Sequence, residues 1–212
     1  MSAHPETTLK PRKQPRQARS QATVDAIFDA TIQVLLAGGL QKLTTIRVAE
    51  RAGVSVGTLY QYYPNKQALL YAVLARHLDR ILDAVEAAAT AKHGKPLADM
   101  VGAVVHAFVR AKTDRIEEGR ALYAVAGELE ARELVQQAQQ RSRTLLGSML
   151  DTAPDARFDD LPMAAYMFST AMTGPIQAVM EGTAPARLVR TLPHHLESLC
   201  LGYLQREAAP RP

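Results

Sequence analysis

The chain has 212 residues, which is enough for one large domain or two small ones. Its hydrophobic fraction of 47% supports a packed core and excludes an intrinsically disordered protein. The formal net charge is +4, and all of this excess lies in the first twenty residues, which hold five basic residues and one acidic residue. We expect a basic flexible arm over residues 1–19 that is attracted to a polyanion. A solvated terminus that only aids solubility is the alternative.

Cysteine usage and hydropathy indicate the cytoplasm. Cys200 is the single cysteine, which excludes an intrachain disulfide and fits a reducing compartment. A buried thiol and a Cys200–Cys200 bond between two copies both stay open. The first twenty residues hold no apolar leader, and no window holds eighteen uninterrupted apolar residues. We therefore expect a cytoplasmic protein without a membrane partner.

Helical periodicity begins soon after the arm. Apolar residues recur at three- and four-residue intervals up to the pair Gly38-Gly39, which predicts a first helix that ends there. This stripe consists of Val24, Ile27, Phe28, Thr31, Val34 and Leu35. No segment alternates apolar and polar residues as a half-buried strand does, so the chain is predicted to be all-α.

Residues 43–70 predict two short helices joined by a tight turn. Thr44 and Thr45 can cap the first of them, because a hydroxyl accepts the free backbone N–H groups of a first turn. Gly53 follows this helix at the place where a left-handed residue ends a helix without a Cβ penalty.

The second short helix is predicted over Val56–Tyr63. Ser55 is its N-cap, Pro64 stops it, and Asn65 caps the helix that follows. Two helices around a glycine-containing turn form a helix-turn-helix, which places its second helix in the DNA major groove. The unit is expected over residues 20–64, and the basic arm before it could then enter a minor groove.

Polar side chains crowd this second helix, and we predict that they contact DNA. Thr58 and Gln61 are candidates for base edges, since Gln pairs with adenine and the Thr methyl can touch a thymine methyl. Gly57 would let the backbone approach DNA closely. The full predicted set is Thr45, Ser55, Val56, Gly57, Thr58, Tyr60, Gln61, Tyr62, Tyr63 and Lys66.

Structural roles compete with several of these assignments. Thr45 and Ser55 can act as caps and also contact phosphate, as Tyr63 and Lys66 are predicted to do. Packing under the unit is the alternative for Tyr60 and Tyr62, and a solvated charge is the alternative for Lys66.

The stretch AGVSVGTLYQYYPNKQALL resembles the DNA-binding domain of TetR-family transcriptional regulators. The resemblance covers roughly residues 16–74. It implies a homodimeric repressor that is released from a palindromic operator by a small ligand. Members of the family often carry a basic residue near the start of the second helix, where this chain has Val56 and Gly57. Base contact is therefore expected from Thr58, Gln61 and the tyrosines.

Residues 65–205 are predicted to form a larger helical domain for effector binding and dimerisation. Apolar stripes and breakers place its helices at 65–91, from 97, at 115–127, 132–150, 161–181 and 185–203. Residues 151–162 are expected to form a loop, and Gly174-Pro175 to kink the helix around it. We expect a frayed tail over residues 206–212.

The last two of these helices carry too many apolar residues for one stripe each. A helix that is apolar on two faces must bury both. We therefore expect helices 161–181 and 185–204 to pair with their copies across a two-fold axis.

An effector pocket between helices of the larger domain is implied by the resemblance. It would suit a mostly hydrophobic molecule with one or two polar handles, for which His106 and Arg110 are candidates. Plain core packing is the alternative for its apolar residues. The predicted set is His106, Phe108, Arg110, Tyr123, Tyr166, Met167 and Met172.

Catalysis, metal and cofactors are not expected. The chain has no glycine-rich phosphate loop, no nucleophile elbow and no zinc-spaced His-Glu pair. His194 and His195 are neighbours on a helix and point about 100° apart, so they do not form a metal site. Two other functions stay open: an architectural DNA-binding protein without an effector, and an all-helical enzyme.

Overall fold

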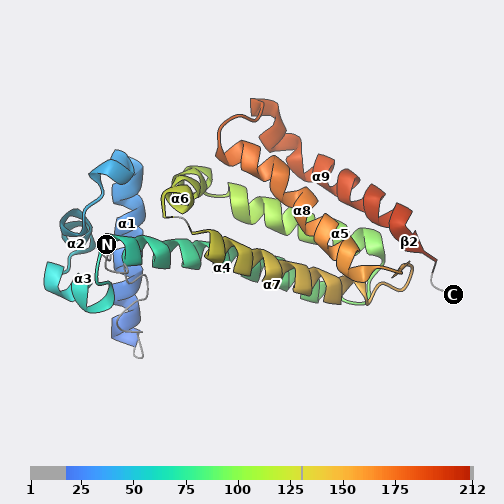
Figure 1. Ribbon diagram of the computed structural model, residues 1–212, viewed down its shortest axis with the longest axis horizontal. Coiled ribbons are helices and arrows are strands. Elements are labelled where there is room, and N and C mark those ends of the chain that lie inside the picture. Colours follow the sequence, from blue (N-terminus) through green and yellow to red (C-terminus); the bar gives the residue numbers. More distant parts are fainter. Residues whose placement is uncertain (1–17, 130, 211–212) are drawn as a thin grey trace, which may run out of the picture. The chain divides into compact units, whose positions relative to one another are not determined.

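The computed structural model describes residues 18–129 and 131–210 (Figure 1). These residues form nine helices and one pair of very short strands, which confirms the predicted all-α class. The predicted basic arm lies outside the described residues, except for its last two positions, of which only the backbone is described. The helices are α1 Ala18–Lys42, α2 Thr45–Ala52, α3 Val56–Tyr62, α4 Lys66–Ala91, α5 Leu97–Thr113, α6 Ile116–Glu128, α7 Arg132–Leu150, α8 Leu161–Met180 and α9 Ala186–Glu207.

The chain divides into two compact units. The first comprises the chain up to His77 together with Ala121–Ala131, and the second comprises the remainder. The sequence analysis predicted a domain boundary between residues 64 and 65, whereas the two units divide inside α4, between His77 and Leu78. Leu69, Leu70 and Val73 of α4 are buried within the first unit. A three-helix unit is too small to bury a large core, and the start of α4 adds the surface that it needs.

The core of the first unit is built around α1. Phe28 of α1 packs against Tyr63, with 5.7 Å between the ring centroids. The guanidinium of Arg76 lies 5.2 Å from the centroid of Phe28 and pairs with Asp25. These contacts join α1, the end of α3 and α4 into one packed body.

The segment Ser20–Lys42 is long and apolar enough to cross a membrane, by length and composition alone. Core helices of water-soluble proteins pass the same test. Here Ile27, Phe28 and Leu35 from this segment are buried in the first unit. Its apolar character therefore serves the core of that unit.

Gly39 interrupts α1 close to its predicted end. Its φ of 68° is left-handed, and its non-helical backbone kinks α1 three residues before the helix ends at Lys42. Glycine adopts this conformation without the clash that a Cβ would cause. The chain can thus turn from α1 towards the cap of α2.

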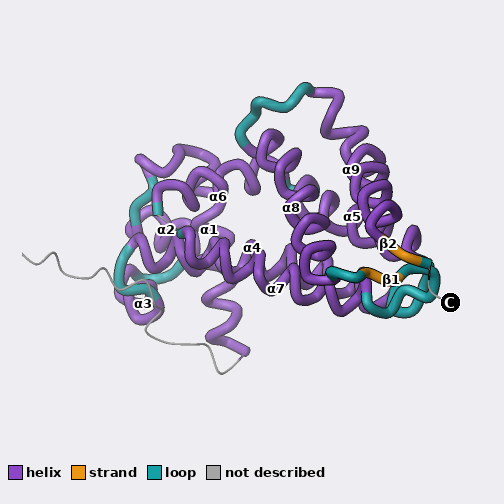
Figure 2. The backbone as a smooth tube through the Cα atoms, turned by 45° about the vertical axis from the view of Figure 1, so that its right-hand side comes forward, coloured by secondary structure: helices purple, strands orange, loops and turns teal. Residues whose placement is uncertain are grey.

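Helices of the second unit are arranged around the middle of α8 (Figure 2). Phe168 of α8 is fully buried, together with Met149 of α7, Val105 of α5 and Cys200 of α9. Burial raises the pKa of the Cys200 thiol to about 12. A thiol that is buried and protonated does not form a disulfide between two copies, so of the two alternatives the buried thiol is the one observed. α8 continues past Pro175 to Met180.

Two short strands correct the expectation of a chain without strands and of a frayed end. β1, Arg157–Phe158, pairs in antiparallel register with β2, Ala208–Ala209. The loop that contains β1 also caps α5, because Asp155 accepts a hydrogen bond from the backbone N–H of Leu97 at 2.9 Å. Sequence patterns miss such a pair, since two residues are too few to alternate.

Candidate nucleic-acid interface and ligand pocket

Helices α2 and α3 form the predicted helix-turn-helix in the first unit (Figure 1). Thr44 is the N-cap of α2, and its hydroxyl accepts the backbone N–H of Arg47 at 3.3 Å. Gly53 ends α2 with a left-handed φ of 67°. Ser55 caps α3 by accepting the backbone N–H of Thr58 at 3.0 Å. The turn chemistry predicted from the sequence is confirmed at Gly53 and Ser55.

Two faces of α3 have different surroundings. Leu59 is completely buried and Tyr62 is 7% exposed, so this face packs on the unit. Gly57, Tyr60 and Gln61 are exposed on the other side. The second face is the part of the predicted set that is available to a partner.

Thr45 and Tyr60 hold each other in place. The Thr45 hydroxyl lies 3.1 Å from the phenolic oxygen of Tyr60, which joins α2 to α3. Thr45 is 9% exposed, whereas Tyr60 is 40% exposed. Thr45 thus orients the outward-facing ring, and Tyr60 is the more accessible of the two predicted contacts.

Tyr62 and Tyr63 are placed in the core. They are 7% and 4% exposed, and their ring centroids lie 6.4 Å apart. Burial raises the pKa of Tyr63 to about 12, so its phenol stays neutral. Packing is the alternative that the sequence analysis left open for Tyr62, whereas Tyr63 was expected to contact phosphate. The Tyr63 ring instead fixes the end of α3 on α1 through Phe28, and the Tyr62 ring packs beside it.

Gly57 has space around it. A Cβ at this position would meet only the Ser55 hydroxyl oxygen within 4 Å, at the ordinary contact distance of 3.7 Å. The fold itself therefore does not require glycine here. A partner that approaches the α3 backbone closely would require glycine at this position.

Basic residues precede and follow α3 in the chain, whereas α3 itself carries no charged residue. Lys42, Arg47 and Arg51 are exposed, and Lys66 is partly buried at the start of α4. Over the same stretch, residues 40–66, Glu50 is the one acidic residue. The N-termini of α2, α3 and α4 add partial positive charge. This charge distribution favours the binding of a polyanion next to the uncharged exposed face of α3.

Arg47 is a cation that the sequence analysis did not single out. Its guanidinium donates to the backbone carbonyl of Lys42 at 3.0 Å, which holds the exposed group beside the N-terminus of α2. The sequence could have indicated Arg47 as a phosphate contact, because it lies in the first turn of α2, two residues after Thr45.

A pocket of about 110 Å³ lies in the second unit between α4, α5, α7 and α8. We call it the Lys112 pocket, because Lys112 of α5 lines it. Phe108 and Met172, both predicted ligand contacts, line it as well. Lys112 was missed, although it follows Phe108 by four residues on an apolar helix stripe.

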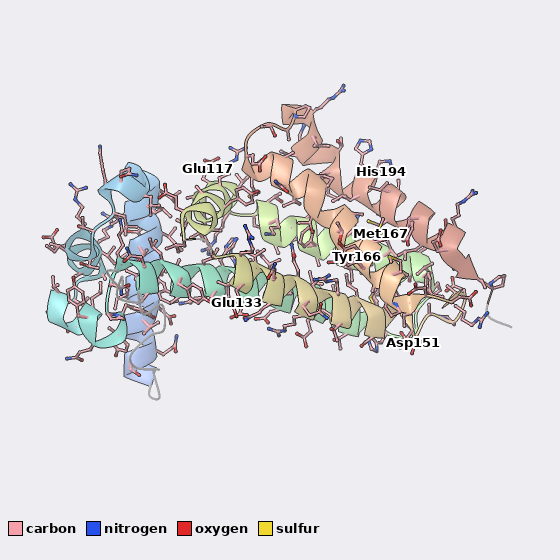
Figure 3. The ribbon with its side chains drawn as sticks, in the orientation of Figure 1. Glu117, Glu133, Asp151, Tyr166, Met167 and His194 are labelled. Carbon is pink, nitrogen blue, oxygen red and sulfur yellow. The ribbon has the colours of Figure 1, made fainter. Side chains whose placement is uncertain are left out.

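The other five predicted ligand residues lie elsewhere. His106 pairs with Glu197 of α9 at 3.1 Å. Arg110 lines a different surface pocket, between α4 and α5, and Tyr123 belongs to the first unit. Tyr166 and Met167 lie on α8 and are 44% and 41% exposed (Figure 3). The helical stripes were predicted well, but a stripe does not tell which of its members faces a cavity.

Two family models match the chain. The model for the tetracyclin repressor-like C-terminal domain matches residues 96–204, just over half of the chain. The model for bacterial regulatory proteins of the tetR family matches residues 27–73, which contain α2 and α3. The chain belongs to the TetR family. The resemblance noted in the sequence is thereby confirmed.

Individual relatives agree with this assignment. The HTH-type transcriptional repressor KstR of Mycolicibacterium smegmatis is 42% identical over 87 residues, 40% of this chain and 42% of the relative. The class D tetracycline repressor protein of Escherichia coli is 39% identical over 64 residues, 28% of this chain and 29% of the relative. The chain spans less than half the length of these curated relatives.

Solved structures share the fold over nearly the whole chain. A putative TetR-family transcriptional regulator from Mesorhizobium loti superposes with a TM-score of 0.72 and 16% identity, covering 91% of this chain and all of the other. At this identity the likeness establishes the fold alone.

Proposed function

We propose that this TetR-family protein is a cytoplasmic transcriptional repressor that binds a palindromic DNA operator as a homodimer and is released by a small ligand. One observation carries the DNA-binding part. The exposed face of α3 presents neutral hydrogen-bonding groups, flanked by Lys42, Arg47, Arg51 and Lys66. In a helix-turn-helix, basic residues are expected to contact the DNA phosphates, while uncharged side chains of the second helix contact the bases. The names of the relatives support repression.

Gln61 is the proposed base-reading residue of α3. It is exposed, and its amide can pair bidentately with adenine. Gln61→Ala should relax preference at one base position in each half-site and cost about 1–3 kcal/mol of operator affinity. Competition binding with single-base operator variants measures this. Unchanged discrimination at every base position would exclude Gln61 from base reading.

Lys66 is proposed to contact a phosphate from the start of α4. Lys66→Ala should weaken binding to operator and random DNA about equally, because phosphates carry no sequence information. The slope of log K against log salt should become shallower by about one unit. Fluorescence anisotropy over a salt series measures it. If the slope for Lys66→Ala equalled that of the parent, Lys66 would not contact a DNA phosphate.

Exposed apolar side chains support the homodimer. Tyr166 and Met167 lie three and four residues after Met163 on α8, so the three share one face, and they are 41–51% exposed. Leu199 of α9, which packs beside α8, is 55% exposed. Such a surface on a single chain indicates a protein partner, and a second copy satisfies it through a two-fold interface.

Ligand release is proposed to act through α4. This helix begins with Lys66 and continues to the Lys112 pocket, which it lines with Leu78, Ile81, Leu82 and Val85. A ligand that favours a conformer with wider-spaced recognition helices would lower the population competent for DNA. The effector residues Phe108 and Met172 remain proposed contacts.

An architectural DNA-binding protein is the alternative that the sequence analysis left open, and the repressor relatives do not favour it. Gel shifts on random and selected DNA separate the two, because architectural binding shows little sequence preference. A selected operator that binds at least about a thousandfold tighter than random DNA supports the regulator. Equal binding to both would favour the architectural role.

A further inference from the structure

Lys112 is the one ionisable side chain that lines its pocket. The walls from α4, α7 and α8 are aliphatic residues, hydroxyls and an amide, among them Leu82, Val85 and Thr173. The Nζ atom of Lys112 lies 6.0 Å from the ring centroid of Phe108. The cation therefore faces a mostly apolar surface.

No anion compensates this charge among the described residues. The ion pairs of that part of the chain do not include Lys112, and burial alone lowers the pKa of its ammonium to about 8. A nearby carboxylate would oppose that fall in pKa. Near neutral pH the fold thus holds a partly buried cation that has no carboxylate partner among these residues, which favours the binding of an anion.

We propose that the Lys112 pocket binds a compact organic carboxylate, whose carboxylate meets the Lys112 ammonium and whose apolar body packs against Leu82, Val85 and Met172. The inference rests on the proposed ligand-released function and specifies its effector class. A charge-assisted hydrogen bond to the ammonium would give orientation, while the apolar walls would give most of the contact area.

The size of the pocket limits the apolar body. Its volume is about 110 Å³. An engineered cavity of about 150 Å³ in another protein accommodates benzene. The Lys112 pocket is smaller than this, so the apolar body can be at most one ring or a short alkyl chain, with the carboxylate towards Lys112.

This assignment replaces the polar handles expected from the sequence. His106 is already paired with Glu197, and Arg110 lines another surface pocket. Arg110→Met is therefore a matched control for Lys112→Met, since it removes the same charge from the same helix without altering the pocket lining.

Isothermal titration calorimetry of the full chain tests the proposal with paired probes: benzoate and hexanoate against benzamide and hexanamide. The parent and Arg110→Met should bind each carboxylate at least about tenfold tighter than its amide. Lys112→Met should lose this preference and still bind the amides. It should also fold, with a melting temperature at or above that of the parent, because it removes a partly buried charge that has no carboxylate partner.

The pH dependence supplies a second readout. Benzoate binding to the parent should weaken by roughly thirtyfold between about pH 7 and about pH 9.5, as Lys112 loses its proton near pH 8. Benzamide binding should not change over this range, since no other lining residue titrates.

Three results would overturn the proposal: equal binding of acid and amide to the parent, a preference that survives Lys112→Met, or no binding of any probe at about 10 mM, where a millimolar affinity would be measured. Operator binding is measured separately by anisotropy. If the protein bound carboxylates but not operator DNA, the proposed regulatory function would be refuted and the carboxylate site would stand. If only the amides released the operator, the carboxylate site would be refuted and the regulatory function would stand.

Discussion

Met167→Glu should convert the protein to a monomer and weaken operator binding by about a hundredfold or more. Met167 is the last residue of the exposed apolar run Met163, Tyr166 and Met167 of α8 and is 41% exposed. In a two-fold interface a new carboxylate would be buried twice without a cation partner, which opposes association. Each monomer would then hold only one half-site and lose the effective concentration that the dimer provides.

Sedimentation velocity at micromolar concentration measures the first effect, and anisotropy with labelled operator measures the second. Gln136→Glu is the matched control, because it adds the same charge at an exposed position of α7. The control should remain dimeric and bind normally. A dimeric Met167→Glu protein with parental affinity would remove α8 from the interface.

Gly57→Ala should reduce operator affinity by about ten- to a hundredfold and leave the fold intact. Alanine is favoured over glycine in a helix by up to about 1 kcal/mol, and the new Cβ has an ordinary contact with Ser55. The melting temperature should therefore stay level or rise. The loss would arise at the DNA, where the added methyl separates the α3 backbone from the groove.

Gly127→Ala is the control for this substitution. Gly127 lies on α6, and a Cβ added there would meet no side chain or neighbouring element within 4 Å, so alanine should be equally well tolerated. It should leave anisotropy titrations with operator unchanged. If Gly57→Ala bound operator as tightly as the parent, close approach of the α3 backbone would be excluded.

Local turn chemistry could be predicted from the sequence because it depends on few residues. Gly53 and Ser55 adopt the expected left-handed and capping conformations. The cap of α2 illustrates the limit: Thr44 and Thr45 are equivalent by type, and only the start of the helix shows that Thr44 caps while Thr45 binds Tyr60.

Burial of individual side chains could not be predicted as well. Ile46 and Val48 are both apolar residues of α2, yet Ile46 is 56% exposed and Val48 is completely buried. Tyr63 and Lys112 were misjudged for the same reason: which way a side chain faces depends on helices distant in sequence. For Tyr63 that partner is Phe28 of α1, and for Lys112 it is the walls from α4, α7 and α8.

Selection of bound fragments from random DNA by the intact protein tests the central claim most directly. The account predicts one enriched palindrome whose half-site centres lie about one helical turn, roughly 10 base pairs, apart or a small multiple of it. Two protein chains should bind each selected fragment. Selected pools without a common sequence, or with a single unrepeated site bound by one chain, would contradict it.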